Sequence, residues 1–372
     1  MIFLQIRHSI SVLIIIIKKK SLIKTRKARL RIFLWIVSNF ITNTVSSLLW
    51  LIDSVFYPEY KLINIKRIAI ILGQPRSGTT FLQRQLCKDK SNFTGVPHFF
   101  WRFPSIFLYK LLKKTNLLEY FNSIPYWSQK RGSIANKMHS HVLGDVEEDG
   151  IFLEEKFWSH FFIFRRIPIP EILPLIDDWE RFDQIKKNKI IKIHKQILNK
   201  WKIINSCEEN VTFILKENDA TDFVKYFISK NTDVTIIFLA REPKEFLDSY
   251  LELSIQSTYS KIGLNPININ NWFRACIEKR ITESKKQINL LKTHKDLIIS
   301  LNFKNLTLDP LNSIFKIYNE LKIKLDLEYI QELENLNKIQ SRRDKGYNNK
   351  SYNIDLKDFN DYSNYIEQHK KQ

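Results

Sequence analysis

Short apolar runs alternate with amphipathic segments along most of the chain. Four of these runs are rich in β-branched residues and are short enough to be buried strands of a parallel sheet. They are KRIAIIL (66–72), VTFIL (211–215), VTIIFLA (234–240) and LIISL (297–301). The first and third runs lead directly into polar loops, which is typical of a strand that ends at a functional edge of a sheet.

Segments with helical spacing follow three of these predicted strands. Apolar side chains recur with helical spacing after the first loop, a helix is expected from Pro243 to about Gln256, and another begins at Asp309-Pro310. Strands that alternate with helices predict an α/β fold. We expect a parallel β-sheet of the phosphate-loop type, flanked by helices on both faces.

The stretch from 97 to 200 has a different pattern and predicts a mostly helical insertion. Its aromatic segments FFWRF (99–103) and FWSHFFIF (157–164) are expected in the core or against a membrane rather than as a substrate platform. It also carries the acidic cluster GDVEEDG (144–150). This cluster is either a solvated turn or a set of functional carboxylates.

The N-terminal region combines a basic tail with an uncharged hydrophobic stretch. The first 31 residues hold nine basic and no acidic side chains, and residues 32–52 carry no charge. The uncharged stretch is long enough to cross a bilayer, although Ser, Thr and Asn interrupt it. A spanning helix, a helix in the membrane interface and a helix packed on the catalytic domain all stay open. We expect membrane association through this single segment, residues 1–56, followed by one domain over 57–372.

Composition and charge narrow the possible functions. A hydrophobic fraction of 44% in 372 residues is ample for a globular core. The net charge is +20, but only +11 remains beyond residue 31, so the basic excess is concentrated where it favours anionic lipid. No nucleic-acid recognition motif is present, so no nucleic-acid partner is expected. The three cysteines and eight histidines show no metal-ligand spacing, and we assign no metal.

The segment ILGQPRSGTT (71–80) joins the first predicted strand to the first predicted helix. Such a loop presents backbone N–H donors at a helix N-terminus and binds phosphate or sulfate. A nucleoside triphosphate loop would place Lys directly after its second glycine, a position that Thr79 occupies. A phosphosulfate places less charge on its transferred group, so one loop cation and several hydroxyls can hold it without a metal. The candidate cofactor residues of the loop are Arg76, Ser77, Gly78, Thr79 and Thr80.

Two motifs together resemble those of sulfotransferases that use 3′-phosphoadenosine 5′-phosphosulfate (PAPS), in the branch common in bacteria and some eukaryotes. They are PRSGTTFL (75–82) and FLAREPKEFLDSYLEL (238–253). In that family the first motif holds the 5′-phosphosulfate, and an Arg and a Ser of the second hold the 3′-phosphate. The resemblance therefore implies PAPS as co-substrate, with Arg241 and Ser249 as further cofactor-binding residues. Looser matches, among them LKEN (215–218) with its retained Lys216, extend the resemblance from about Tyr57 to Phe359.

The candidate catalytic residues lie partly where the chain departs from the family pattern. The family has a Trp-Glu pair after the loop helix, whose carboxylate is often credited as the general base, but His98 and Phe99 stand there. Imidazole can accept an alcohol proton near neutral pH, so His98 is a candidate base, although it could also be a plain histidine on an aromatic helix. By resemblance, Glu147, or His139 hydrogen-bonded to it, faces the acceptor.

These patterns predict a transferase that moves a sulfuryl group from PAPS to a hydroxyl of a carbohydrate, lipid or other alcohol. The acceptor is expected to be a small molecule or a glycolipid. A P-loop kinase is the rival enzyme, disfavoured by the missing lysine and by the lack of a convincing Mg²⁺-binding Asp at a strand end. A catalytically degenerate, PAPS-binding membrane protein is the alternative that the altered base region favours.

Overall fold

The chain forms two compact units, each assembled from three stretches of sequence. The sheet unit comprises residues 66–95, 208–252 and 277–372, and the helical unit comprises residues 1–65, 96–207 and 253–276. The computed structural model describes residues 23–125, 134–155, 166–175, 179–206, 210–231, 233–341 and 350–369, together with residues 10, 13, 14, 17 and 18. The aromatic segment at 157–164 lies outside the described residues.

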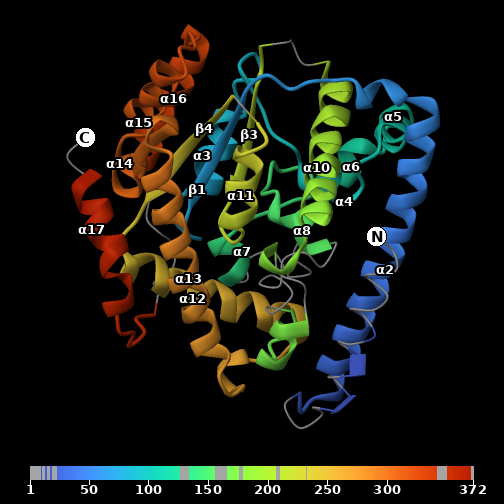
Figure 1. The fold of residues 1–372 in the computed structure, drawn as a ribbon, viewed down its shortest axis with the longest axis vertical. Helices are drawn as coiled ribbons and strands as arrows, with labels where there is room; N and C mark the ends of the chain where they lie inside the picture. Colours follow the sequence, from blue (N-terminus) through green and yellow to red (C-terminus); the bar gives the residue numbers. More distant parts are fainter. Residues whose placement is uncertain are drawn as a thin grey trace. The chain divides into compact units, whose positions relative to one another are not determined.

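The sheet unit contains a five-stranded parallel sheet in the order β2-β3-β1-β4-β5. Figure 1 labels its three central strands, β3, β1 and β4. Its strands are β1 (Ile68–Gly73), β2 (Phe93–Thr94), β3 (Thr212–Glu217), β4 (Val234–Ala240) and β5 (Ile298–Asn302). Ile68 at the start of β1 pairs with Phe213 in β3 and with Val234 in β4. The carboxyl ends of these three central strands therefore meet at one edge, and the predicted α/β fold is confirmed.

Helices cover this sheet and bury its apolar side chains. They are α3 (Thr79–Leu86), α11 (Thr221–Ile228), α14 (Phe303–Leu308), α15 (Pro310–Glu320), α16 (Leu327–Ser341) and α17 (Asn360–His369). Leu82 and Leu86 of α3 pack with Ile71 and Ile214 in one buried cluster. The expected Asp-Pro helix start is confirmed, because the Asp309 side chain accepts a hydrogen bond from the Asn312 N–H and caps α15.

The described part of the helical unit consists mainly of helices, as the pattern between 97 and 200 predicts. They are α2 (Arg26–Phe56), α4 (His98–Arg102), α5 (Ile106–Lys114), α6 (Leu118–Ser123), α7 (Ile134–Met138), α8 (Gly150–Glu155) and α10 (Gln184–Asn205). Phe99, Phe100 and Trp101 are buried, so the FFWRF segment belongs to the core. Two further helices, α12 (Pro243–Ile262) and α13 (Trp272–Thr293), contain unit boundaries within their lengths.

The uncharged N-terminal stretch lies within the long helix α2. Its length and hydropathy would suffice to cross a membrane, a criterion that core helices and signal sequences also meet. One third of the most apolar window of α2 is buried inside the protein. α2 is therefore a contributor to the core of the helical unit as well as an apolar surface.

Candidate active site

The loop between β1 and α3 is held tightly by its two glycines. A Cβ atom at Gly73 would lie 2.8 Å from the Leu239 carbonyl oxygen, so only glycine allows this approach of β1 to β4. Gly78 has a φ of 86° and directly precedes the first residue of α3. Arg76 also has a positive φ, 72°, which is rare for a residue with a side chain and is typical of functional loops.

The N-terminus of α3 has the properties of an anion-binding site. The first N–H groups of a helix lack partners within the helix, and the helix dipole adds partial positive charge there. The Ser77 hydroxyl, just before this terminus, is buried and has no hydrogen-bond partner among the described residues. Backbone and side chain together thus present several donors to a phosphate or sulfate group.

The second predicted motif meets the loop although 165 residues separate them in sequence. β4 ends at Ala240, and the Arg241 guanidinium donates a hydrogen bond to the Arg76 carbonyl oxygen. The Arg76 Nε donates to the Ser249 hydroxyl at 3.0 Å. The Arg241 guanidinium also stacks 3.9 Å above the centre of the Phe303 ring. The predicted cofactor residues of both motifs are therefore brought together.

Lys216 is a further cation at this loop. It lies near the end of β3, opposite Ile71 of β1, and its Nζ donates to the Thr80 hydroxyl at 2.8 Å. The residue is 1% exposed. A buried ammonium beside the α3 N-terminus supplies the positive charge that a lysine inside the loop would otherwise provide.

A network of buried polar side chains supports the loop between β1 and α3. The Thr79 hydroxyl donates to the Asn218 side chain at 3.2 Å, and the Gln74 amide donates to Gln287 at 2.9 Å. Arg280 of α13 is fully buried and pairs with Asp219. Because these partners come from two separate segments, the end of β3 and α13, the loop is fixed before any ligand binds.

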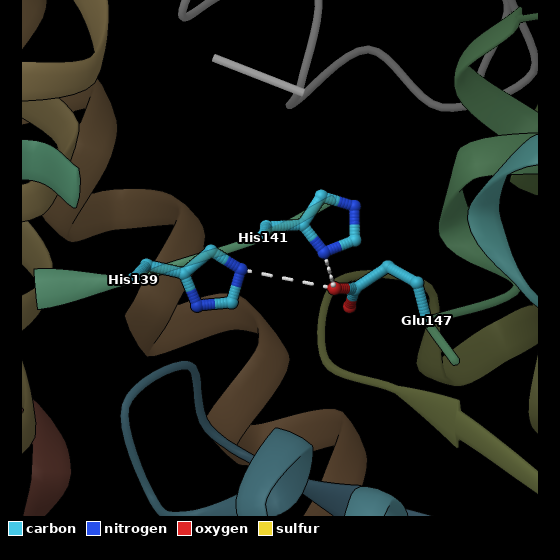
Figure 2. A group of neighbouring side chains, drawn as sticks. All are labelled: His139, His141 and Glu147. Atoms are coloured by element: carbon cyan, nitrogen blue, oxygen red, sulfur yellow. Dashed lines mark ion pairs between the residues drawn. The ribbon is translucent and has the colours of Figure 1, made fainter. Parts of the chain in front are cut away.

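The helical unit contains a second cluster of polar side chains, built from histidines and a carboxylate. His98 begins α4, and its Nδ1 lies 2.7 Å from the His141 Nε2. The other ring nitrogen of His141, Nδ1, lies 3.0 Å from the Glu147 Oε2 (Figure 2). The His139 Nε2 lies 3.7 Å from the same carboxylate oxygen (Figure 2). His98, His141 and Glu147 thus form a continuous polar chain.

This cluster is buried and fixed by the backbone around it. Pro97 and Val146 form an antiparallel bridge, and the Trp101 indole N–H donates to the Glu147 carbonyl oxygen at 3.2 Å. Glu147, Glu148 and Asp149 are buried, so the acidic cluster is not a solvated turn. Burial is the main cause that lowers the pKa of His98 well below its ordinary value, and the neighbouring His141 and Arg102 act in the same direction.

Sequence reasoning named three members of this cluster and missed the one that links them. His139 and His141 stand two positions apart, and the resemblance singled out His139. His141 is 3% exposed and contacts both His98 and Glu147, whereas His139 is more open and contacts Glu147 at longer distance. The ligand atoms of His139, His141 and Glu147 lie within 4.8 Å of one another, a spacing that would also suit a divalent cation.

A parallel α/β sheet with a glycine-containing loop between β1 and α3, and with an arginine at the end of the neighbouring strand β4, is typical of folds of the phosphate-loop type. The sequence model of the sulfotransferase family matches residues 69–327, more than half of the chain. The protein therefore belongs to the sulfotransferase family and is a transferase enzyme.

Two solved structures share this fold. Sulfotransferase STF9 from Mycobacterium avium aligns with a TM-score of 0.68 and 14% identity over 92% of this chain and 86% of that one. Sulfotransferase STF1 from Mycobacterium tuberculosis H37Rv aligns with a TM-score of 0.62 and 16% identity over 88% of this chain and 86% of that one. No curated protein matches the chain significantly in sequence. At these identities the solved structures support the fold, and the family match supports the chemistry.

Proposed function

We propose that the protein transfers a sulfuryl group from PAPS to a hydroxyl of a carbohydrate, lipid or other alcohol. The observation that carries this proposal is the meeting of Arg76, Ser249 and Arg241 at a loop without the triphosphate lysine. Two arginines and a helix N-terminus suit a ligand with two separate anionic ends. PAPS has this form, with a phosphosulfate at its 5′ end and a phosphate at its 3′ end.

In this proposal the residues of the loop and of the second motif divide the donor between them. The α3 N-terminus, Arg76 and the hydroxyls of Ser77, Thr79 and Thr80 hold the 5′-phosphosulfate, joined by Lys216 through its contact with Thr80. Arg241 and Ser249 hold the 3′-phosphate. The cations stabilise the negative charge that develops on the leaving 5′-phosphate as the acceptor oxygen bonds to sulfur and the bridging S–O bond breaks.

The histidine cluster supplies the proton acceptor. The acceptor hydroxyl loses its proton as its oxygen attacks sulfur, and a neutral imidazole can take it. His98 stays neutral because of burial, and it is joined through His141 to the Glu147 carboxylate. A negative carboxylate at the end of this chain stabilises the positive charge that protonation brings. His139 is the second candidate for the same role.

The decisive experiment is a transfer assay with radiolabelled PAPS and a total lipid and glycan extract, followed by identification of the labelled product. Labelled product supports sulfotransfer and names the acceptor. Binding of adenosine 3′,5′-bisphosphate with no turnover on any fraction would instead support a degenerate PAPS-binding protein. Tighter binding of Mg²⁺-ATP than of adenosine 3′,5′-bisphosphate would support the kinase alternative.

A calorimetric titration with adenosine 3′,5′-bisphosphate in the presence of a chelator tests the metal-free cofactor site. We expect binding to be unchanged by the chelator, because cations of the protein already face the phosphates. A requirement for Mg²⁺ would contradict this part of the proposal. Loss of turnover on chelation without loss of binding would assign a cation to the cluster of His139, His141 and Glu147.

A further inference from the structure

Helix α2 carries a row of polar residues on the side that is buried in the helical unit. One side of the helix is buried along nearly its whole length, and more than half of the residues on it are polar. The buried residues are Ala28, Ile32, Ile36, Asn39, Thr42, Asn43, Ser46 and Asp53. Most of them recur every three or four positions, and Asp53 follows Ser46 by seven, or two turns, so they form one face of the helix.

The buried face is held by specific polar contacts within the helical unit. The Asp53 carboxylate lies 3.0 Å from the Lys200 ammonium of α10 and accepts hydrogen bonds from the Ser105 hydroxyl and two N–H groups at the start of α5. The Asn43 amide donates to the Asn39 side chain and carbonyl oxygen. The Asn43 bonds lie within α2, whereas the Asp53 contacts, added to the packing of Ile32 and Ile36, hold α2 to the rest of the unit.

The opposite face of α2, here called the outer stripe, is apolar. Between 33 and 56 eleven residues are exposed, and all except Ser38 are apolar. The outer stripe consists of Phe33, Leu34, Val37, Phe40, Ile41, Val45, Leu48, Leu51, Val55 and Phe56. Leu48, Leu51, Val55 and Phe56 are each at least 60% exposed. A contiguous apolar surface of this length marks an interaction site.

The hydroxyl groups beside the outer stripe need no water. Those of Thr44, Ser47 and Ser54 donate to the carbonyl oxygens of Phe40, Asn43 and Trp50, each four positions earlier in the helix. Such back-bonding satisfies a hydroxyl inside the helix itself. These three hydroxyls can therefore leave water at little cost.

Basic side chains border the outer stripe at both ends. Arg26 and Lys27 are exposed in the first turn of α2. At the other end α2 contacts α5 (Figure 1). The apolar residues Phe107 and Leu111 and the basic residues Lys110, Lys113 and Lys114 of α5 are exposed. Cations beside an apolar surface are typical of a protein surface that binds anionic lipid headgroups.

We propose that the outer stripe, with Phe107 and Leu111, binds the surface of an anionic membrane and that α2 lies in the membrane plane. A spanning helix must be surrounded by lipid or by other membrane-embedded protein, but α2 is covered on one side by the helical unit from Ala28 to Asp53. Its 31 residues measure about 46 Å, well beyond the roughly 30 Å hydrocarbon core. This proposal concerns a surface and does not depend on the identity of the sulfuryl donor.

Vesicle flotation of the full-length protein tests the surface. Wild type is expected to float with phosphatidylcholine vesicles that contain phosphatidylserine, and more weakly with phosphatidylcholine alone. The double variant Leu48→Asp/Leu51→Asp should lower the bound fraction by about tenfold or more, because two charges would enter the apolar layer. The control Ile185→Asp removes an apolar side chain on α10 that is even more exposed, at 81%, and should float like wild type. Circular dichroism and nucleotide binding confirm that each variant is folded.

Equal flotation of the double variant and wild type would overturn the proposal. Dimerisation of wild type that is lost in the double variant, measured by light scattering without lipid, would assign the stripe to a second copy of the chain instead. In that case flotation would also be absent, so the two occupants are distinguished. A wild type that is monomeric and does not float would likewise reject a membrane-binding stripe.

The orientation of α2 is tested with a fluorescent label at each of Leu34, Ile41, Leu48 and Val55, replaced by cysteine one at a time in a variant without its native cysteines. These positions are seven residues apart and lie on the same face of the helix. An in-plane helix predicts similar, shallow depths at all four labels in depth-dependent quenching by lipid-bound quenchers. Depths that change steadily from Leu34 to Val55 would show a spanning helix and overturn the in-plane arrangement.

Discussion

In the sheet unit the candidate cofactor groups are placed by the backbone, whereas in the helical unit the candidate catalytic groups are placed by side-chain contacts. Gly73 and Gly78 shape a loop between adjacent elements, and parallel pairing of β1 with β3 and β4 brings Lys216 and Arg241 to its side. The chain His98–His141–Glu147 joins residues up to 49 positions apart through their rings and a carboxylate. The first arrangement tolerates loss of one side chain better than the second.

The largest effect is expected in the histidine cluster. His98→Ala or Glu147→Ala should lower turnover by about 10² to 10⁴, because a general base and its charge partner act in the transition state. His141→Ala should lower turnover by a similar factor, because it breaks the link between His98 and Glu147. His141→Asn should keep part of the turnover that His141→Ala loses. Affinity for adenosine 3′,5′-bisphosphate should stay unchanged in calorimetry.

The pattern of these variants also identifies the base. If His98→Ala and Glu147→Ala keep full turnover, the proton acceptor lies elsewhere, and His139 is the next candidate. Lys357→Ala, which removes a side chain 86% exposed in the sheet unit, is the control for general effects of substitution.

The second largest effect concerns the stability of the helical unit. Asp53→Ala leaves the Lys200 ammonium buried without its carboxylate and removes three hydrogen bonds at the start of α5. Loss of one partner of a buried ion pair should lower the free energy of unfolding by about 3 to 5 kcal/mol. Urea denaturation measures this cost. Asp355→Ala, in an exposed pair with Lys357, should leave stability within about 0.5 kcal/mol of wild type.

These two units also differ in how far the sequence predicts them. The strands from Ile68 to Asn302 follow from short apolar runs, and the loop follows from its glycines, because both features are local. Among the strands in the described part of the chain, β2 was missed, since Phe93–Thr94 is too short for any apolar run to identify. Its place at the edge of the sheet depends on pairing with β3, which is a tertiary contact.

The site residues that the sequence did not identify were missed for the same reason. Lys216 was recognised as a family match, but its contact with Thr80 depends on the pairing of β3 with β1. His141 differs from His139 only by two positions, and nothing local distinguishes which of them is buried. The two faces of α2 were likewise invisible in its mean hydropathy, although the three- to four-residue spacing of Asn39, Asn43 and Ser46 was a usable signal.

The third prediction tests the cofactor role of the second motif. Arg241→Ala should weaken binding of adenosine 3′,5′-bisphosphate by about 2 to 4 kcal/mol, as expected for loss of a charge-assisted pair with phosphate. Arg241→Lys should lose less, because it keeps the charge but not the two-pronged geometry. Isothermal titration calorimetry gives both values. Equal affinities of Arg241→Ala and wild type would remove Arg241 from the cofactor site.

The fourth prediction distinguishes Lys216 from a structural lysine. Lys216→Met keeps much of the side-chain volume but removes the charge, and should weaken PAPS binding by about 1.5 to 3 kcal/mol. The loss should be smaller for adenosine 2′,3′-bisphosphate, which has no 5′ anion for Lys216 to contact. Equal losses with both ligands would mean that Lys216 only supports the fold of the loop.

The smallest effect is expected in the pH dependence of turnover, which compares His98 with the more open His139. Burial places the folded-state pKa of His98 below 6.5, so its neutral, proton-accepting form persists as the pH falls through that value. Turnover should therefore change by less than about twofold between pH 7.5 and 6.5 and decline only at lower pH, whereas an ordinary histidine base would lose about half its neutral form at pH 6.5. The free energy of unfolding should also fall as the pH falls. Below pH 6.5 the unfolded chain takes up a proton on His98 that the folded chain resists, so lowering the pH destabilises the protein. A profile of turnover against pH for wild type and for His139→Ala measures the pH at which turnover declines on the acid side. A decline at or above pH 6.5 that disappears in His139→Ala would assign the proton acceptor to His139.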